Sequence, residues 1–248
     1  MAKFVLVHGA FAGGWIWEPL AQRLRSAGHS VEVPDQPGAG DDHTPVAEVT
    51  LDSCAKRIAA VVKQSAEPAF LVGNSMGGLI ATQAAVHCAA QVSGLIYVSA
   101  FAPHDGQSLL AITQQPEGAG DQVQANITIE GEPPVAIMPA AASRHALYAE
   151  CTEETAAWAI GRQRPQPVAP FATPVSIPAG VLDSIPRYYV CCLRDRAIPL
   201  PLQRRMIREA RCADIVELDT DHTPQLSKTA ELAEALERFA SHRAEATA

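Results

Sequence analysis

A serine flanked by glycines is the most informative short pattern in this sequence. Residues 73–77 read Gly-Asn-Ser-Met-Gly, which has the form G-x-S-x-G. The apolar run 70–72 precedes the pattern directly, and an alanine-rich stretch of helical character follows it. Glycines two residues either side of the serine leave room for a sharp turn from strand to helix, which lifts the hydroxyl to the end of the sheet. Ser75 is therefore the predicted nucleophile.

The competing interpretation of this glycine-rich turn is a phosphate-binding loop. No lysine follows the turn to meet phosphate groups, and the pattern G-x-G-x-x-G is absent from it. The sequence therefore favours the nucleophile over the phosphate loop.

A serine hydroxyl is a weak nucleophile, so it needs a base within hydrogen-bond reach. In enzymes with this turn, the acid and then the histidine follow the serine along the chain. Among the eight histidines, His222 follows a predicted strand and precedes the last predicted helix, whereas His242 belongs to a surface helix near the C-terminus. We expect His222 to be the base. Surface or lid positions are expected for the histidines at 29, 43, 87, 104 and 145.

The acid that orients this histidine should come just after the preceding strand. Asp195 meets this condition and lies 27 residues before His222, which leaves room for one helix and one strand. Its neighbours Arg194 and Arg196 are expected to keep the carboxylate ionised. Four other aspartates fit less well, because they precede the strand, begin the next one or lie too close to His222: Asp183, Asp214, Asp219 and Asp221.

Two backbone N–H groups are expected to form the oxyanion hole. Met76 begins the helix after the nucleophile, and Ala10 lies in the loop after the first predicted strand. His8, in the same loop, is interpreted as a structural residue that fixes the loop by hydrogen bonding.

Short β-branched runs alternate with helical patterns, which is the signature of a parallel sheet with helices on both faces. The predicted strands are 4–8, 30–34, 69–73, 94–99, 187–193 and 214–218. The predicted helices are 19–26, 51–64, 76–90, 200–210 and 229–242.

The alternation stops over residues 103–186, where only short helices are indicated, at 140–148 and 152–160. We expect residues 1–102 and 187–248 to form the core and residues 103–186 to form an inserted lid, since such insertions often line pockets. Candidate pocket residues are Gly9, Phe11, Phe101, Tyr148 and Trp158, although each aromatic side chain could equally serve to pack the lid.

The composition indicates a globular protein, with 48% hydrophobic and 19% charged residues. A net charge of −8, spread along the chain, argues against nucleic acid and anionic membrane surfaces as partners. The six cysteines form no C-x-x-C pair, and no signal peptide or membrane span is indicated. We therefore expect a cytoplasmic protein with reduced thiols, a small-molecule substrate and no metal or other cofactor, with a homodimer left open.

Taken together, these segments resemble the α/β hydrolases, and within them the plant methyl-ester esterases, the related hydroxynitrile lyases and bacterial esterases. The resemblance rests on residues 4–10 with 14–17, on Asp195 with 198–199, and on residues 221–228. It implies an α/β-hydrolase fold, a mostly parallel sheet with an inserted lid, and a Ser75–His222–Asp195 triad.

Two positions discriminate within this branch. The lyases typically have threonine where this chain has Gly9, and lysine where it has Thr223. The resemblance therefore implies a cofactor-independent serine esterase that forms an acyl-enzyme on Ser75. A hydroxynitrile lyase and a non-catalytic small-molecule receptor are the alternatives. Asn74 is a further departure, since the family commonly has histidine before the serine.

Overall fold

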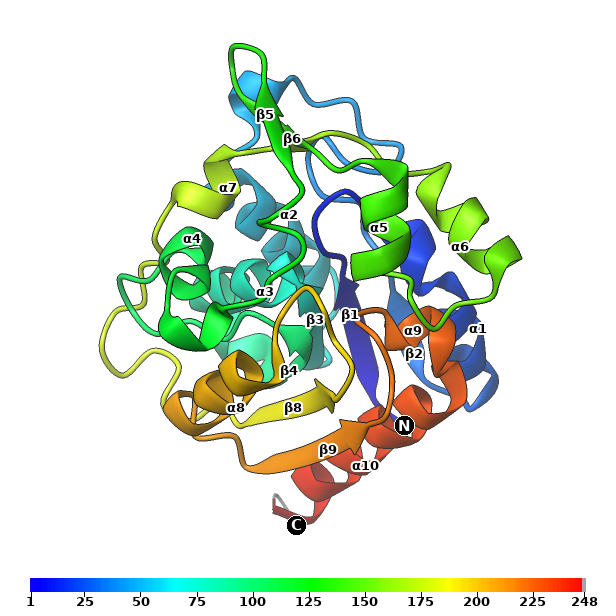
Figure 1. Cartoon of the computed structure of the whole chain (residues 1–248). Coiled ribbons are helices and arrows are strands. Elements are labelled where there is room, and N and C mark those ends of the chain that lie inside the picture. The colour runs from blue at the N-terminus through cyan, green and yellow to red at the C-terminus, as the bar shows by residue number, and fades with distance from the viewer. Residues whose placement is uncertain (247–248) are drawn as a thin grey trace.

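The computed structural model describes residues 1–246, with side chains up to residue 242. Six parallel strands form the central sheet in the order β2-β1-β3-β4-β8-β9 (Figure 1). Their bounds are β1 Lys3–Val7, β2 Ser30–Glu32, β3 Ala69–Ser75, β4 Val92–Ala100, β8 Arg187–Cys192 and β9 Asp214–Leu218. Each predicted strand is present, with ends that differ by at most two residues.

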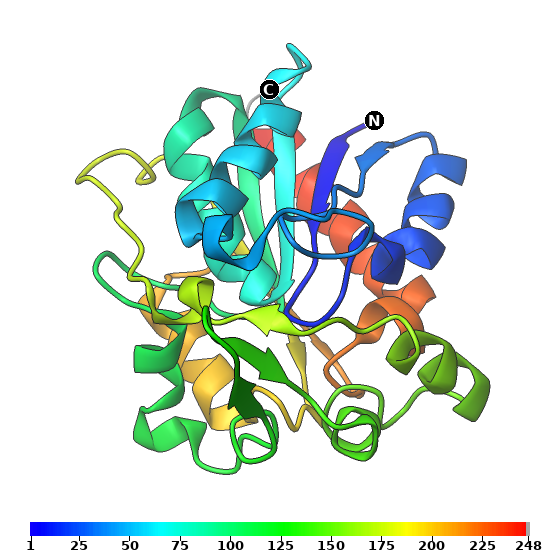
Figure 2. The ribbon, with the colours of Figure 1, turned by 90° about the horizontal axis from the view of Figure 1, so that it is seen from above.

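The inner strands are apolar because both faces of the sheet are covered. All five residues of β1 are buried, as are most of β3, β4 and β8. Helices α2 (Leu51–Lys63) and α3 (Met76–Cys88) pack together on one side, and α1 (Glu18–Ser26) packs with α10 (Thr229–Ala246) on the other (Figure 2). Helix α8 (Leu200–Glu209) connects β8 to β9, and the short α9 (Pro224–Ser227) precedes α10.

Residues 103–186, here called the cap, lie between β4 and β8 over the carboxyl ends of the strands (Figure 1). The cap holds helices α4 Leu109–Thr113, α5 Ala140–Ala146, α6 Glu153–Ile160 and α7 Ala169–Ala172. It also holds an antiparallel sheet of β5 Thr128–Glu130, β6 Val135–Ile137 and β7 Gln166–Pro167, which the sequence did not indicate. No helix among residues 1–246 is long and apolar enough to cross a membrane.

The turn between β3 and α3 depends on two glycines. A Cβ atom on Gly77 would lie 2.2 Å from the carbonyl oxygen of Val7, and one on Gly73 would lie 2.5 Å from the backbone of Gly77. The absence of a side chain at Gly77 lets the first turn of α3 pack directly against the end of β1, and its absence at Gly73 lets β3 turn closely into α3. The serine between these glycines is held at that end of the sheet.

We expect Gly77→Ala to lower the free energy of unfolding by about 3 kcal/mol or more, because the new methyl group meets backbone that cannot move aside easily. Gly28→Ala is the matched control. Gly28 has a φ of +89° and no heavy atom within 4 Å of the added Cβ. Only backbone strain of about 1 kcal/mol is expected there. Urea denaturation of both variants measures the difference, and equal losses would contradict the close packing proposed for the turn.

Candidate active site

Ser75 ends β3 in a backbone conformation that residues other than glycine seldom adopt. Its φ and ψ are 56° and −126°, and helix α3 starts at the next residue. The side chain is partly exposed to the space beneath the cap. The sequence-predicted nucleophile therefore lies on a strained strand-to-helix turn and faces a cavity.

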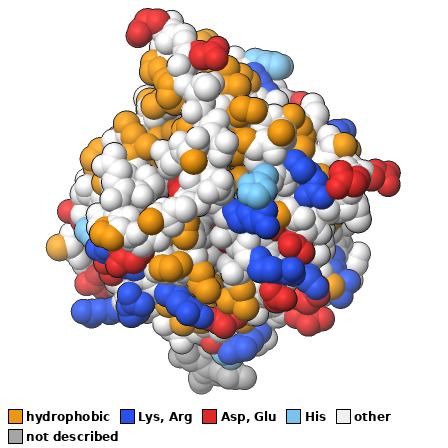
Figure 3. All heavy atoms as spheres, viewed as in Figure 1, with side chains coloured by type: hydrophobic (Ala, Val, Ile, Leu, Met, Phe, Trp, Pro, Cys, Tyr) orange, Lys and Arg blue, Asp and Glu red, His pale blue; other side chains and the backbone are white. Residues whose placement is uncertain are grey.

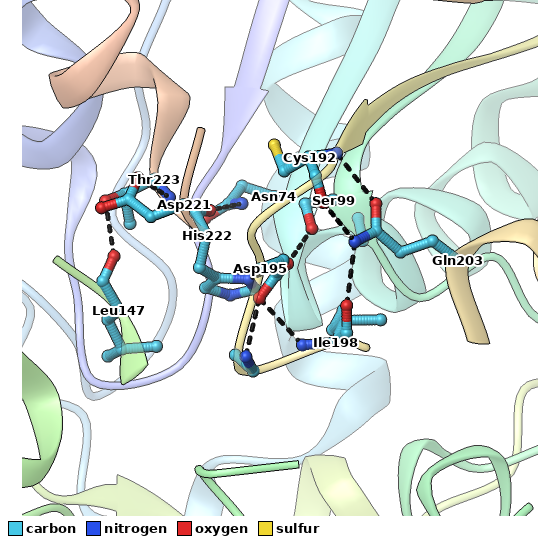
Figure 4. A network of polar contacts seen from close by, with 12 residues as sticks. Asn74, Ser99, Leu147, Cys192, Asp195, Ile198, Gln203, Asp221, His222 and Thr223 are labelled. Atoms are coloured by element: carbon cyan, nitrogen blue, oxygen red, sulfur yellow. Dashed lines mark hydrogen bonds and ion pairs between the residues drawn. The ribbon is translucent and has the colours of Figure 1, made fainter. Parts of the chain in front are cut away.

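His222 lies in the loop between β9 and α9, with its side chain almost fully buried. Its Nδ1 atom lies 2.7 Å from Oδ2 of Asp195, so the ring donates a hydrogen bond to that carboxylate. The side-chain amide of Asn74, beside the nucleophile, donates to the carbonyl oxygen of His222 at 3.1 Å (Figure 4). The residue before the serine thus fixes the backbone that carries the histidine.

Asp195 follows β8 and is held by four hydrogen bonds. Its Oδ1 accepts from the backbone N–H groups of Ala197 at 2.7 Å and Ile198 at 3.0 Å. Its Oδ2 accepts from the Ser99 hydroxyl as well as from His222 (Figure 4). With both oxygens engaged, the carboxylate has little freedom to rotate away from the imidazole.

The expected role of the arginines beside Asp195 is not found. Arg194 forms ion pairs with Glu150 and Asp219, and Arg196 donates to His145. Neither contacts Asp195, because their side chains point to the surface while the carboxylate points into the protein. Backbone N–H groups and a hydroxyl stabilise the carboxylate instead.

The buried pair changes the basicity of the histidine. Burial by itself lowers the pKa of His222, but the negative charge of Asp195 and its hydrogen bond act in the opposite direction. The more distant charges of Asp221 and Asp121 add to this effect, and the net result is a pKa raised above the ordinary value of 6.5. The neutral ring is therefore a stronger base than a free imidazole.

The two predicted oxyanion residues lie beside the nucleophile. Ala10 and Met76 line the same cavity as Ser75. Met76 is the first residue of α3, and the first N–H groups of a helix have no partner within the helix. Both positions are thus suited to donating backbone hydrogen bonds to an oxygen beside Ser75.

His8 holds the loop that carries Ala10. Its Nδ1 donates to the carbonyl oxygen of Gly9 at 2.9 Å, and its Nε2 accepts from the backbone N–H of Gln36 at 3.1 Å. Burial lowers the pKa of His8 and so favours the neutral ring that this arrangement needs. The histidine is fully buried, and these bonds give it the structural role expected from the sequence.

Two small cavities meet at Ser75. The first, of about 30 Å³, is lined by Phe101, Leu109, Asp121 and Phe171 among others, and the second, of about 40 Å³, by His222 and Tyr148 among others. Ala10, Ser75 and Val123 line both. Each has room for only a few water molecules, so side chains around them would have to move to admit an ester.

The predicted pocket residues divide between these cavities, with one exception. Gly9, Phe11 and Tyr148 line the second cavity, and Phe101 lines the first. Trp158 lines neither of them. It lies on α6, where its ring packs edge-on against Trp15 at 5.2 Å and beneath the guanidinium of Arg162.

Gly9 leaves the nucleophile uncrowded. A Cβ atom at this position would lie 2.8 Å from Cβ of Ser75 and 3.5 Å from its Oγ. A larger side chain here would have to push the serine or the loop aside. The threonine expected in the lyases therefore does not fit this arrangement without a shift.

Residues beside His222 attach its loop to the cap. Oδ2 of Asp221 accepts from the backbone N–H of Glu150 at 2.8 Å, and the Thr223 hydroxyl donates to the carbonyl oxygen of Leu147 at 2.7 Å (Figure 4). These bonds explain why Asp221, a rejected candidate for the acid, is nevertheless buried.

Ser99, Asp121 and Val123 are residues of the site that sequence reasoning missed. Ser99 could have been found, because it lies near the carboxyl end of β4, where site residues of parallel sheets gather. Asp121 and Val123 gave no such signal, since they belong to a cap segment without regular secondary structure.

Comparison with known proteins agrees with the geometry. The alpha/beta hydrolase family matches residues 4–235. Methylesterase 7 of Arabidopsis thaliana is 29% identical, with 93% of both chains covered. An alpha-hydroxynitrile lyase of the same plant is 30% identical, with 96% of both covered. A carbendazim hydrolyzing esterase of Nocardioides is 39% identical, but this match spans only 45% of the chain and 47% of that protein.

Solved structures show the same fold. A pyrethroid hydrolase from Sphingobium faniae has a TM-score of 0.86 at 25% identity, with 98% of this chain and 99% of that chain covered. Polyneuridine aldehyde esterase has the same TM-score at 24% identity, with 97% and 99% covered. The sequence match over nearly the whole chain and the shared fold lead to one conclusion: the chain belongs to the alpha/beta hydrolase family.

Proposed function

We propose that the protein is a cofactor-independent serine esterase that cleaves a small carboxylic ester through an acyl-enzyme on Ser75. The observation that carries the proposal is the buried His222–Asp195 pair, which opens into the same cavity as a serine on a strained turn. Esterases recur among the relatives and the structural neighbours, which supports the same reaction.

In the proposed mechanism, His222 removes the proton of the Ser75 hydroxyl as its oxygen attacks the ester carbonyl. The N–H groups of Ala10 and Met76 hold the oxyanion, and protonated His222 then gives its proton to the departing alcohol. Water, activated by His222, releases the acid. Ser75 and His222 make no hydrogen bond with each other in this structure, and such contacts commonly tighten when substrate binds.

The two cavities suggest where each half of the ester binds. The alcohol must take a proton from His222, so we assign it to the second cavity, which that histidine lines. The acyl group stays bonded to Ser75 and is assigned to the first cavity, whose other lining residues are mostly apolar. An ester that occupies both must pass Val123.

The surface supports a small neutral substrate over a charged macromolecule. On the face in Figure 3, basic and acidic side chains lie next to one another around α8 and β9. Ion pairs of this kind join Arg194 to Glu150 and Arg205 to Glu117. A surface whose charges are paired locally presents no extended basic field to a polyanion.

We further propose a cytoplasmic location, supported by six cysteines that are all free thiols.

All of the proposed catalytic residues come from one chain. The site is therefore complete in a monomer or in each half of a homodimer.

A hydroxynitrile lyase is the second candidate, because one such enzyme is among the relatives that match nearly the full chain. The lack of room for a threonine side chain at position 9 and the bond of Thr223 to the cap favour the esterase. Cyanide release from mandelonitrile, measured beside hydrolysis of p-nitrophenyl acetate, separates the two activities.

Ser75→Ala is expected to lower kcat for p-nitrophenyl acetate by at least about 10⁴-fold, since the acyl-enzyme can no longer form. Ser26→Ala, at an exposed position of α1, is the matched control and should match wild type. A fluorophosphonate should label wild type at Ser75. Hydrolysis by the alanine variant at the wild-type rate would refute the assignment.

The pH dependence of the esterase activity should follow the raised pKa of His222. Because the base works only when neutral, kcat/KM should fall about tenfold per pH unit below that pKa, and the midpoint should lie above 6.5. A pH–rate profile from pH 5 to 9 measures this. A midpoint at or below 6.5 would contradict the proposed influence of Asp195.

Val123→Ala should widen the passage between the two cavities and favour bulkier esters. The expected result is about a tenfold rise in the ratio of kcat/KM for p-nitrophenyl hexanoate to that for the acetate, from contacts of a few methylene groups. Val181→Ala, in the cap but away from both cavities, is the matched control. An unchanged ratio would mean that Val123 does not separate the subsites.

A further inference from the structure

One carboxylate beside the nucleophile has no part in the proposed mechanism. Asp121 belongs to the cap segment between α4 and β5 and is only 8% exposed. Together with Ser75, it lines the first cavity. Apart from Ser75, Asp121 and Gln124, the residues that line this cavity are apolar. A carboxylate in such surroundings is costly unless something pairs with it.

Only one oxygen of Asp121 is used within the protein. Its Oδ1 accepts from the backbone N–H groups of Val123 at 2.8 Å and Gln124 at 3.0 Å. Within residues 1–246 no hydrogen bond or ion pair reaches Oδ2. The turn at residues 121–124 therefore uses Oδ1 of Asp121 and leaves Oδ2 available to accept a hydrogen bond.

The segment that carries Asp121 is fixed relative to the catalytic residues. The backbone N–H of Gln122 donates to the carbonyl oxygen of Arg196 at 2.8 Å, in the loop that also carries Asp195. The carboxylate consequently has a defined position above the acyl cavity. Fixed polar groups in an otherwise apolar pocket are what orient a ligand and set its specificity.

A role in the turn alone would not require a charge. An asparagine could accept the same two backbone hydrogen bonds through its carbonyl oxygen and would avoid the cost of a buried charge. Burial raises the pKa of Asp121 to about 6, which is the sign of that cost, although the backbone N–H groups and the nearby His222 act in the opposite direction. At pH 8 the carboxyl is still ionised and can only accept hydrogen bonds.

We propose that Asp121 is a specificity-determining residue that accepts a hydrogen bond from an N–H or O–H donor on the acyl part of the substrate. This inference rests on the proposed esterase function and narrows it to esters of acids that carry such a hydrogen-bond donor close to the carbonyl group. An acid without such a donor leaves the carboxylate unpaired in the apolar cavity, which weakens binding.

Two esters of the same shape test this proposal. The p-nitrophenyl esters of pyrrole-2-carboxylic acid and furan-2-carboxylic acid differ by an N–H donor in place of a ring oxygen. The quantity measured at pH 8 is the ratio of kcat/KM for the pyrrole ester to that for the furan ester. Comparing this ratio between variants cancels the different intrinsic reactivities of the two esters.

Asp121→Asn should lower the ratio at least about tenfold, because the asparagine keeps the turn but places an NH₂ donor opposite the substrate N–H. Asp183→Asn, an exposed cap residue, is the matched control and should leave the ratio unchanged. An unchanged ratio in Asp121→Asn, or an equal fall for both esters, would overturn the proposal and leave Asp121 as a turn residue.

Binding supplies a readout that does not require turnover. Pyrrole-2-carboxamide should bind the Ser75→Ala protein more tightly than furan-2-carboxamide, as measured by calorimetry, and Asp121→Asn in that background should remove the difference. Equal binding of the two amides, or binding of neither, would overturn the proposal. Failure of the esterase function itself would appear differently, as wild type that neither hydrolyses p-nitrophenyl acetate nor reacts with a fluorophosphonate.

Discussion

The site depends on one unfavourable backbone conformation, the positive φ of Ser75. Such a conformation costs about 1–3 kcal/mol and persists only where the surroundings enforce it. Here the enforcement is steric: α3 approaches the end of β1 so closely that Gly77 has no room for a side chain, and its first turn lies so close to Gly73 that Gly73 has none either. Ala10, after β1, and Met76, at the start of α3, line the same cavity as the serine.

Hydrogen bonds also link residues at the ends of four strands into one network. Ser99 near the end of β4, Asp195 after β8 and His222 after β9 are joined by hydrogen bonds, and Asn74 at the end of β3 fixes the His222 backbone. Because the strands are parallel, these ends lie at one edge of the sheet. The orientation of the His222 imidazole therefore depends on residues at the ends of several strands and not on a single loop.

Local patterns in the sequence were sufficient to predict the central strands and the turn at Ser75. The buried strands have continuous apolar runs, and the turn at Ser75 has its glycines, so both could be predicted. The positions of Asp195 and His222 followed from their order along the chain. The partners of Asp195 could not be predicted, because Arg194 and Arg196 are neighbours in sequence whereas Ser99 becomes one only through the pairing of β4 with β8.

The cap was the least predictable region for the same physical reason. Its strands β5, β6 and β7 are only two or three residues long, and β7 contains Pro167, so no alternating pattern marks them. Trp158 was expected in the pocket because it is large and apolar, yet Trp15 and Arg162 supply enough contact to hold it elsewhere. Asp121 lies in a segment whose position depends on a backbone contact with Arg196.

Asp195 and Asp121 are both buried near the nucleophile, but their surroundings differ. Asp195 has partners for both oxygens, one of them the imidazole that it orients. Asp121 has partners for one oxygen only, and burial raises its pKa to about 6. A carboxylate with hydrogen bonds to both oxygens stabilises the arrangement around it. A carboxylate with hydrogen bonds to one oxygen only can still accept a hydrogen bond at the other. Because Asp121 lines the first cavity, we propose that the substrate donates that hydrogen bond.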